Sequence, residues 1–387
     1  MHHERILLVV FDAQELVKLS TILSETGAEI IACREAEAAQ ALLSQIKPQI
    51  LISDLSFPPL YGGEGIKLVQ HVKARIPNVV NIGLAHPSEE QLEQLFCRTK
   101  GKLFTRPFAS EALIDFILSI RAAKPNAVGK VHHISLLDDF LRSNSIDSVL
   151  QPIVGIRKDN DGQILGVESL ARPRSSESLW NPEMLFDYAD RKDKTYETDL
   201  ICIRAALSEA NNLSAGLRLF INVRPRSVTH DGFALRIAAM AKEYNFNAQQ
   251  IIFELTEQQT IANLQEFNRS LQDVREQGFG LAIDDFGAGY ANLEWLQCLK
   301  PDFLKLSGVF SNNLDKDASK QVIVRAATQM ARRLDIPTIL ENIERAEELE
   351  KARALGIDFG QGYLFYEPKP AKELNAVITG FQSRLTP

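Results

Sequence analysis

Apolar runs alternate with amphipathic segments along residues 1–122. Short apolar runs bounded by turn residues are typical of buried strands, and apolar residues at helical spacing predict amphipathic helices. Strands are expected at Arg5–Phe11, Ala28–Cys33, Pro48–Ser53, Val79–Leu84 and Lys102–Thr105. Helices are expected at Ala13–Glu25, Glu35–Ile46, Ile66–Arg75, Ser88–Thr99 and Ser110–Ala122. This strict alternation predicts an α/β domain with a doubly wound parallel sheet of the flavodoxin-like kind.

The alternation stops at Ala123–Lys130, where Pro, Asn, Gly and polar residues follow one another. Such a composition predicts a linker at 123–130 between a first domain at 1–122 and a second at 131–387. Strand-like and helical patterns resume in the second domain. Its length is close to the roughly 250 residues typical of a (β/α)8 barrel, and we expect a barrel of that TIM-like type.

The composition is that of a folded protein with a mildly acidic balance. The net charge is −7, with 45% hydrophobic and 24% charged residues. Tracking a polynucleotide backbone needs a basic surface, so we expect no polynucleotide partner. A small anionic ligand remains compatible with this balance, because a few local cations can hold it.

Cysteine spacing and apolar run length bear on the compartment. The four cysteines lie far apart without a CxxC spacing, which predicts reduced thiols rather than a disulfide framework or a zinc cluster. No apolar run approaches the roughly 18 residues of a membrane helix, and Ile6–Phe11 is too short for a signal-peptide core. We therefore expect a cytoplasmic protein with no membrane association.

Several apolar runs of the second domain end in a carboxylate or an amide. The terminal residues are Glu168, Asn222, Glu254, the pair Asp284 and Asp285, and Glu341. In a (β/α) barrel the carboxyl ends of the strands meet at one face, where active sites lie. Five unpaired carboxylates would repel one another strongly there. Hard divalent cations with oxygen ligands, Mg²⁺ or Mn²⁺, resolve this repulsion.

The adjacent pair Asp284 and Asp285 suits two ions, one carboxylate bridging them while its neighbour binds the second. Two ions about 3.5–4 Å apart are the usual arrangement for phosphodiester hydrolysis. Arg172 could present its guanidinium to a phosphate. Lys305, which ends the apolar run Phe303–Leu304, could orient the attacking water or hold a phosphate oxygen. Gln361 opens an expected last strand that could reach the same face.

Each of these residues alone has a plainer interpretation. A single acid after an apolar run is usually a helix N-cap or a solvated loop residue. Arg172 and Lys305 alone would be surface charges, and Asp284-Asp285-Phe286-Gly287 alone could be a turn. The joint pattern is harder to explain as caps, because its members also follow a family order.

The motifs resemble the EAL family of cyclic-di-GMP phosphodiesterases over essentially the whole second domain. Seven motifs correspond in order, and the first consists of two segments: Gln151–Val154 with Glu168–Arg172, then Ile221–Val223, Glu254–Glu257, Asp284–Leu293, Pro301–Lys305, Glu341–Glu344 and Gln361–Phe365. The resemblance implies opening of one phosphodiester of cyclic-di-GMP to give linear pGpG.

The same resemblance implies a role for each matching residue. Glu168, Asn222, Glu254 and Asp284 would bind one metal ion, and Asp284, Asp285 and Glu341 the second. Lys305 would position the hydrolytic water, supported by Gln361, and Leu170 and Arg172 would contact the dinucleotide. Glu257 would brace the loop of 285–293, which in the family couples the metal site to a dimer contact. A homodimer or higher homo-oligomer whose activity depends on the region 286–296 is therefore expected.

Three positions depart from the family pattern. Ser169 replaces an Ala, Asn342 replaces a Gly beside Glu341, and Ser307 replaces an Asp two residues after Lys305. Asn tolerates positive φ best among non-glycine residues, and no departure removes a metal ligand, so activity is expected. The alternatives are a catalytically weak or inactive receptor that binds cyclic-di-GMP and signals through protein contacts, and a scaffold that needs no nucleotide.

The first domain resembles the receiver domains of two-component signalling, with Asp54 at the phosphoacceptor position. Phosphoryl transfer there needs Mg²⁺ held by an acidic pair, a hydroxyl and a lysine. Here Phe11 replaces one acid, Leu84 the hydroxyl residue and Arg106 the lysine. The resemblance implies a histidine kinase or another signalling protein as partner. The three departures favour a degenerate receiver that mediates dimerisation or partner binding without phosphate.

Overall fold

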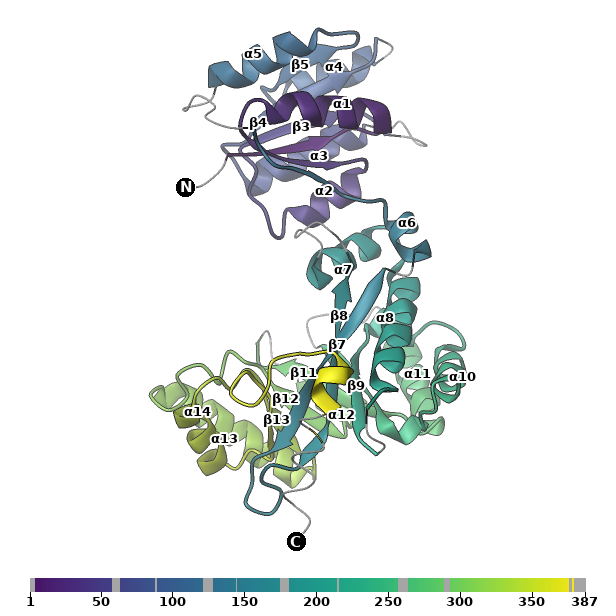
Figure 1. Cartoon of the computed structure of the whole chain (residues 1–387), viewed down its shortest axis with the longest axis vertical. Coiled ribbons are helices and arrows are strands. Elements are labelled where there is room, and N and C mark those ends of the chain that lie inside the picture. The colour runs from purple at the N-terminus through teal and green to yellow at the C-terminus, as the bar shows by residue number, and fades with distance from the viewer. Residues whose placement is uncertain are drawn as a thin grey trace. The chain divides into compact units, whose positions relative to one another are not determined.

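The computed structural model describes residues 4–57, 63–87, 89–120, 128–143, 145–174, 181–213, 216–256, 264–288, 293–375 and 378. The chain divides into two compact units. The first contains residues 1–145 and 173–194, and the second contains residues 146–172 and 195–387. Figure 1 labels many of the helices and strands of both.

The first unit is built on a parallel sheet with the strand order β5-β4-β3-β1-β2-β6. Its strands are β1 (Arg5–Val9), β2 (Glu29–Cys33), β3 (Ile50–Asp54), β4 (Val80–Ala85), β5 (Lys102–Thr105) and β6 (Val131–His133). Its helices are α1 (Ala13–Ser24), α2 (Ala36–Leu42), α3 (Glu64–Arg75), α4 (Glu90–Cys97), α5 (Ser110–Ile120), α6 (Leu137–Arg142) and α7 (Pro182–Arg191). The doubly wound α/β fold expected from the alternation is confirmed.

Apolar side chains of the strands and of helices α1 and α5 form a shared core on one face of this sheet. Leu16 of α1 and Leu113 of α5 share a buried core with Ile6, Ile30 and Ile52 of the strands. Helices α2, α3 and α4 pack against one another in sequence order. Asp54 is the last residue of the central strand β3, so its side chain stands at the carboxyl edge of the sheet.

The division into units differs from the boundary expected at 123–130. Val131–His133 form a sixth strand, which pairs in parallel with β2 and so extends the sheet of the first unit. Helix α7, which follows the barrel strand β8 in the chain, also belongs to the first unit. It is held to α2 and the flanking chain by Gln45 Nε2 donating to Asn181 Oδ1 at 2.8 Å and Arg191 Nη1 donating to Gln40 Oε1 at 2.7 Å.

The second unit is a closed barrel of eight strands in the order β10-β11-β12-β13-β14-β7-β8-β9. The strands are β7 (Ile146–Gly155), β8 (Ile164–Pro173), β9 (Arg218–Asn222), β10 (Ile251–Thr256), β11 (Gly280–Phe286), β12 (Phe303–Leu306), β13 (Thr338–Leu340) and β14 (Phe359–Gly360). The expected eight-stranded TIM-like barrel is confirmed. It departs from a uniformly parallel barrel at β7, which pairs antiparallel with β14.

Helices follow most barrel strands and cover the outside of the barrel. They are α8 (Thr195–Ala210), α9 (Pro225–Val228), α10 (Phe233–Glu243), the 3₁₀ turn η1 (Ala248–Gln250), α11 (Leu264–Glu276), α12 (Leu293–Leu299), α13 (Ala318–Arg333) and α14 (Ala346–Leu355). In the described part of the chain, no helix combines the length and apolarity needed to cross a membrane.

The two-residue period of the strands separates an inner from an outer layer. The inner apolar layer contains Ile153, Phe220, Ile252, Ala282, Phe303 and Ile339. The intervening residues, such as Phe253 and Leu304, join the core between the strands and the helices. Because side chains alternate along a strand, the residue two positions after an inner apolar one also points inward, at the carboxyl end of its strand.

Candidate active site

Five inner apolar residues are each followed, two positions later, by a polar residue. Phe220, Ile252, Ala282, Phe303 and Ile339 are followed by Asn222, Glu254, Asp284, Lys305 and Glu341. The register places Glu254 opposite both Asn222 and Ala282 on the neighbouring strands. The carboxyl ends of β9 to β13 therefore bring these side chains together, as the sequence predicts.

The ammonium of Lys305 lies at the centre of the acidic residues. Its Nζ is 2.8 Å from Glu254 Oε1, 2.9 Å from Asp284 Oδ1, 2.8 Å from Glu341 Oε1 and 3.1 Å from Glu168 Oε2. The lysine side chain is fully buried. A buried ammonium among carboxylates is the compensation that burial of such charges requires.

Two amide side chains complete the cluster. Asn222 Nδ2 donates to Glu168 Oε1 at 2.9 Å and to Glu254 Oε2 at 3.2 Å. Gln361, which directly follows β14, donates from Nε2 to Glu168 Oε2 at 2.7 Å and to Gln151 Oε1 at 2.9 Å. Glu168 therefore contacts three of the other residues that the sequence predicts for the site.

Asp285 lies beside this cluster at an irregular point of β11. The pairing of β11 with β12 shifts register between Ile283 and Phe286, and Asp285 has φ +53°. Such an irregularity re-aims side chains at the end of a strand. Ser307 Oγ donates to Asp285 Oδ1 at 3.0 Å, so the serine that stands in place of an acid is bonded to this carboxylate.

Burial and mutual repulsion shift the pKa values of the cluster. Burial, and then the charge of Glu168, raise the pKa of Glu254 well above its usual range. Burial also raises the pKa of Glu341 well above its usual range, although Lys305 opposes this. Burial alone would lower the pKa of Lys305, but Asp284 and the other carboxylates raise it well above the usual lysine value. The cluster therefore holds its ammonium firmly and still favours further positive charge.

The donor set fits hard divalent cations. Among the described residues, no group of three or more His, Cys, Asp and Glu side chains is arranged to hold a metal ion, and Lys305 lies between the acids instead. Five carboxylates against one ammonium nevertheless leave four negative charges uncompensated when all are ionised. Glu254 Oε1 and Asp284 Oδ1 are buried, and each forms an ion pair with Lys305 Nζ. Such oxygens are suitable ligands for Mg²⁺ or Mn²⁺.

A pocket of about 510 Å³ opens over the cluster. Glu168, Asp284, Asp285, Glu341 and Gln361 form part of its lining. Leu170 and Arg172, which follow Glu168 on β8, line it too. The Arg172 side chain is exposed, with Nη1 donating to Ala171 O at 3.0 Å. The pocket therefore has acids at its floor and a guanidinium at its wall.

Asn342 also lines this pocket and has φ +52°. A backbone conformation of this kind is costly for most side chains, and asparagine is among the residues that tolerate it best. Glu341 N donates to Leu306 O at 3.2 Å, and the Glu341 carboxylate reaches Lys305. The asparagine therefore replaces glycine without removing Glu341 from the cluster.

The sequence interpretation missed Gln151 as a site residue. Its side chain is buried, accepts from Gln361 Nε2 at 2.9 Å, and donates to Tyr366 O at 3.0 Å. The signal was present, because Gln151 interrupts an otherwise apolar run in β7. A polar residue at an inner strand position of a barrel needs a partner.

Two predictions fall on residues outside the described parts of the chain. Glu257 lies there, as does Tyr290 of the expected dimer contact. At the ends of that region, Phe286 and Leu296 are buried and belong to the core between strands and helices. The dimer contact and the role of Glu257 stay predictions.

A family comparison assigns the second unit. The family model described as "EAL domain" matches residues 135–368, more than half of the chain. The chain belongs to the EAL domain family. The resemblance seen in the seven sequence motifs is thereby confirmed.

Curated cyclic di-GMP phosphodiesterases are similar to this chain. Cyclic di-GMP phosphodiesterase PdeF of Escherichia coli strain K12 is 31% identical over 244 residues, which is 62% of this chain and 32% of PdeF. Cyclic di-GMP phosphodiesterase PdeB of Shewanella oneidensis is 26% identical over 383 residues, or 90% of this chain and 43% of PdeB. The chain thus spans less than half the length of these two relatives.

Solved structures are similar in fold to more than half of this chain. The Klebsiella pneumoniae protein BlrP1, in a manganese and cyclic-di-GMP complex, is 28% identical with a TM-score of 0.53, covering 58% of this chain and 56% of its own. A standalone EAL protein from Vibrio cholerae, bound to cyclic-di-GMP, is 27% identical with a TM-score of 0.51, covering 58% of this chain and 92% of its own.

The candidate phosphoacceptor of the first unit is engaged by neighbouring groups. Asp54 is buried, with Oδ1 accepting from Arg106 Nη2 at 2.6 Å and Oδ2 accepting from Phe11 N at 2.9 Å. Arg106 also pairs with Glu15 at 2.9 Å. Burial raises the pKa of Asp54, although Arg106 opposes it. Leu84 lies opposite Asp54 on β4 and offers no hydroxyl.

Proposed function

We propose that this EAL domain hydrolyses cyclic-di-GMP to linear pGpG with two divalent cations, under regulation by the receiver-like first unit. The observation that carries the proposal is the convergence of five carboxylates, two amides and one buried ammonium at a pocket that Arg172 also lines. Names of similar proteins point to the same substrate.

Particular residues would hold the cations and the nucleotide. Glu168, Asn222, Glu254 and Asp284 would hold one ion, and Asp284, Asp285 and Glu341 the other. The two ions would supply Lewis acidity and a nucleophile at neutral pH. Arg172 would bind a phosphate through its guanidinium, and Leu170 would contact the dinucleotide from the same strand.

Lys305 and Gln361 would orient the attacking water. Both carry N–H donors that contact Glu168, a residue of the pocket lining. A buried lysine held in its charged form can also stabilise negative charge that develops on the phosphate. Glu257 would brace the loop after Asp285, and the chain would act as a homodimer or higher homo-oligomer.

Purified protein incubated with cyclic-di-GMP and Mg²⁺ or Mn²⁺ is expected to form pGpG, and a chelator is expected to stop this. Chromatography of the nucleotides measures the product, and light scattering in the same buffer measures the oligomeric state. Tight binding of unchanged nucleotide would favour the inactive receptor instead. Absence of both binding and turnover would favour the alternative of a scaffold that needs no nucleotide. A strictly monomeric, fully active preparation would refute the dimer requirement.

For the first unit, we propose a receiver-like domain that binds a partner, such as a histidine kinase, another signalling protein or a second copy, without phosphorylation. Arg106 and the backbone amide of Phe11 donate hydrogen bonds to the two carboxylate oxygens of Asp54. Phe11 also stands at a position where a receiver needs one acid of its Mg²⁺-binding pair. Acetyl phosphate with Mg²⁺ is therefore expected to add no phosphoryl group, as intact mass spectrometry would show. A phosphorylated product that Asp54→Asn abolishes would contradict this.

A further inference from the structure

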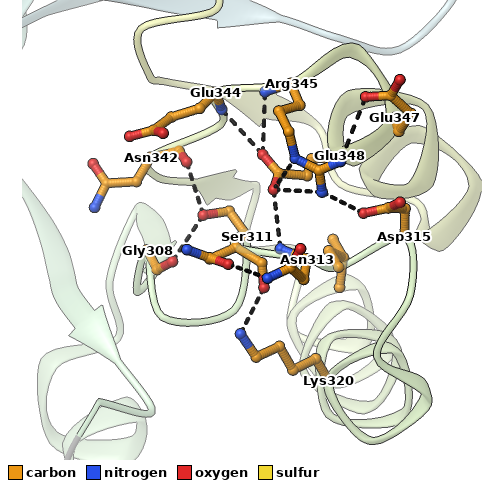
Figure 2. Close-up of polar contacts among 12 residues, drawn as sticks. Gly308, Ser311, Asn313, Asp315, Lys320, Asn342, Glu344, Arg345, Glu347 and Glu348 are labelled. Atoms are coloured by element: carbon orange, nitrogen blue, oxygen red, sulfur yellow. Dashed lines mark hydrogen bonds and ion pairs between the residues drawn. The ribbon is translucent and has the colours of Figure 1, made fainter.

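Glu348, near the start of α14, is a buried carboxylate that the proposed chemistry does not use. It is 3% exposed. Its oxygens accept three backbone N–H groups, from Asn313 at 3.0 Å, Glu344 at 3.2 Å and Arg345 at 3.1 Å. Figure 2 shows these bonds converging on the one side chain. Glu348 thus joins the loop after β12 to the loop after β13.

Arg345 adds charged donors to the same carboxylate. Its Nε and Nη2 lie 3.0 and 2.9 Å from Glu348 Oε1, and Nη2 also lies 2.5 Å from Asp315 Oδ1. Burial alone would raise the pKa of Glu348, but the Asn313 amide and the other donors lower it. The carboxylate is therefore ionised at neutral pH, and Asp315 extends the connection along the first loop.

A second connection between the two loops involves Ser311 and Asn342. The buried Ser311 hydroxyl lies 2.9 Å from Asn342 O and 2.8 Å from Gly308 O. The Asn342 side chain lies over Gly308, where an added Cβ would stand 2.0 Å from its amide nitrogen. Side chains of both loops are drawn together in Figure 2.

The loop after β12 is also anchored from α13. Lys320 Nζ donates to Val309 O at 2.6 Å and to Asn312 O at 2.7 Å. This loop is therefore fixed on one side by α13 and on the other by Glu348. It can serve as a firm support for the loop after β13.

The supported loop begins at the site itself. Glu341 directly precedes Asn342, and its carboxylate lies 2.8 Å from Lys305 Nζ. Glu341, Asn342 and Glu348 all line the pocket. The Glu344 amide, bound by Glu348, is only three residues beyond Glu341. The carboxylate of α14 thus constrains the backbone that carries a candidate ligand.

We propose that Glu348 is a positioning residue that, by binding the loops after β12 and β13 at once, holds Glu341 in place and sets the affinity of the site for divalent cations. The inference rests on the proposed function. Groups that orient ligands without touching the metal commonly contribute about 10–100-fold to metal affinity. The alternative is that Glu348 only caps α14 and stabilises the fold.

Calorimetric titration with Mn²⁺ alone, below the melting temperatures of all variants, distinguishes a positioning role of Glu348 from a purely structural one. Glu348→Ala is expected to weaken Mn²⁺ binding by about 10–100-fold. Asp358→Ala is the matched control, because Asp358 also accepts a backbone amide, from Thr338 at 2.9 Å, and an arginine, Arg157 at 3.0 Å, but does so at the end of β13 opposite to Glu341. It is expected to lower the melting temperature comparably and leave Mn²⁺ affinity unchanged.

Two milder variants keep the test decisive if Glu348→Ala folds poorly. Glu348→Gln retains one oxygen acceptor and is expected to lose less affinity. Ser311→Ala removes the independent connection to Asn342 and is expected to weaken Mn²⁺ binding with Glu348 intact. Unchanged Mn²⁺ affinity in the Glu348 variants, or equal weakening by Asp358→Ala, would overturn the inference. Failure of the wild type to bind Mn²⁺ would instead overturn the proposed function.

Discussion

Replacing Lys305 with methionine is expected to destabilise the metal-free barrel by roughly 3–5 kcal/mol at neutral pH, the cost of removing one partner from a buried ion pair. The ammonium is fully buried and lies within 3.1 Å of four carboxylates. Methionine has a similar shape but no charge, so those carboxylates would face one another without compensation. Turnover is also expected to fall by about 10²–10³-fold through loss of one donor.

The pH dependence gives this prediction a distinctive sign. The folded-state pKa values of Glu254 and Glu341 lie above their unfolded values, so the protonated cluster stabilises the fold at low pH. That stability is lost as the pH rises above about 4.5, the ordinary glutamate value, through the raised pKa values. Removal of Lys305 should therefore cost more at pH 8 than at pH 5.

Thermal unfolding at the two pH values, with and without Mn²⁺, measures this effect. Mn²⁺ is expected to raise the melting temperature of Lys305→Met more than that of the wild type, because it restores positive charge to the cluster. Lys372 is exposed, so Lys372→Met is the control and should change neither the melting temperature nor the turnover. A Lys305→Met protein as stable and active as the wild type would show that the ammonium does not balance these acids.

Much of the barrel site could be predicted because its signal is local and periodic. Phe220 and Asn222 lie two positions apart on one strand, as do Phe303 and Lys305, and a strand alternates strictly between two faces. Once the fold is a barrel, these pairs dictate that the polar members meet at the carboxyl ends. Hydrophobic patterning together with the barrel topology was therefore enough to predict which residues form the cluster.

The remaining features depend on tertiary contacts that no local pattern encodes. Lys305 was expected to assist the acids, yet it lies at their centre, since side-chain length and depth decide that position. Glu348 looks like any acid in the first turn of a helix, and its contact with Asn313 crosses from one loop to another. Likewise, nothing in Val131–His133 distinguishes a sixth strand of the first sheet from a first strand of the barrel.

Glu168→Gln is expected to abolish measurable pGpG formation, with a loss of roughly 10³-fold or more, corresponding to about 4 kcal/mol of transition-state stabilisation. Glu168 Oε1 accepts from Asn222, and Oε2 accepts from both Lys305 and Gln361. An amide in its place must direct its NH₂ group at one of these donors, whichever way it is turned. It also removes one negative charge from the cation site.

The neighbouring Ser169→Ala provides the matched control for this prediction. Ser169 is buried, and its hydroxyl lies 2.8 Å from that of Ser148. Its removal is expected to cost about 1 kcal/mol of stability and to leave turnover unchanged. Both variants would be assayed for pGpG and titrated with Mn²⁺, and the Mn²⁺ affinity should fall only for Glu168→Gln. Turnover by Glu168→Gln within about tenfold of the wild type would place the chemistry away from Glu168, and the acid cluster would then need another explanation.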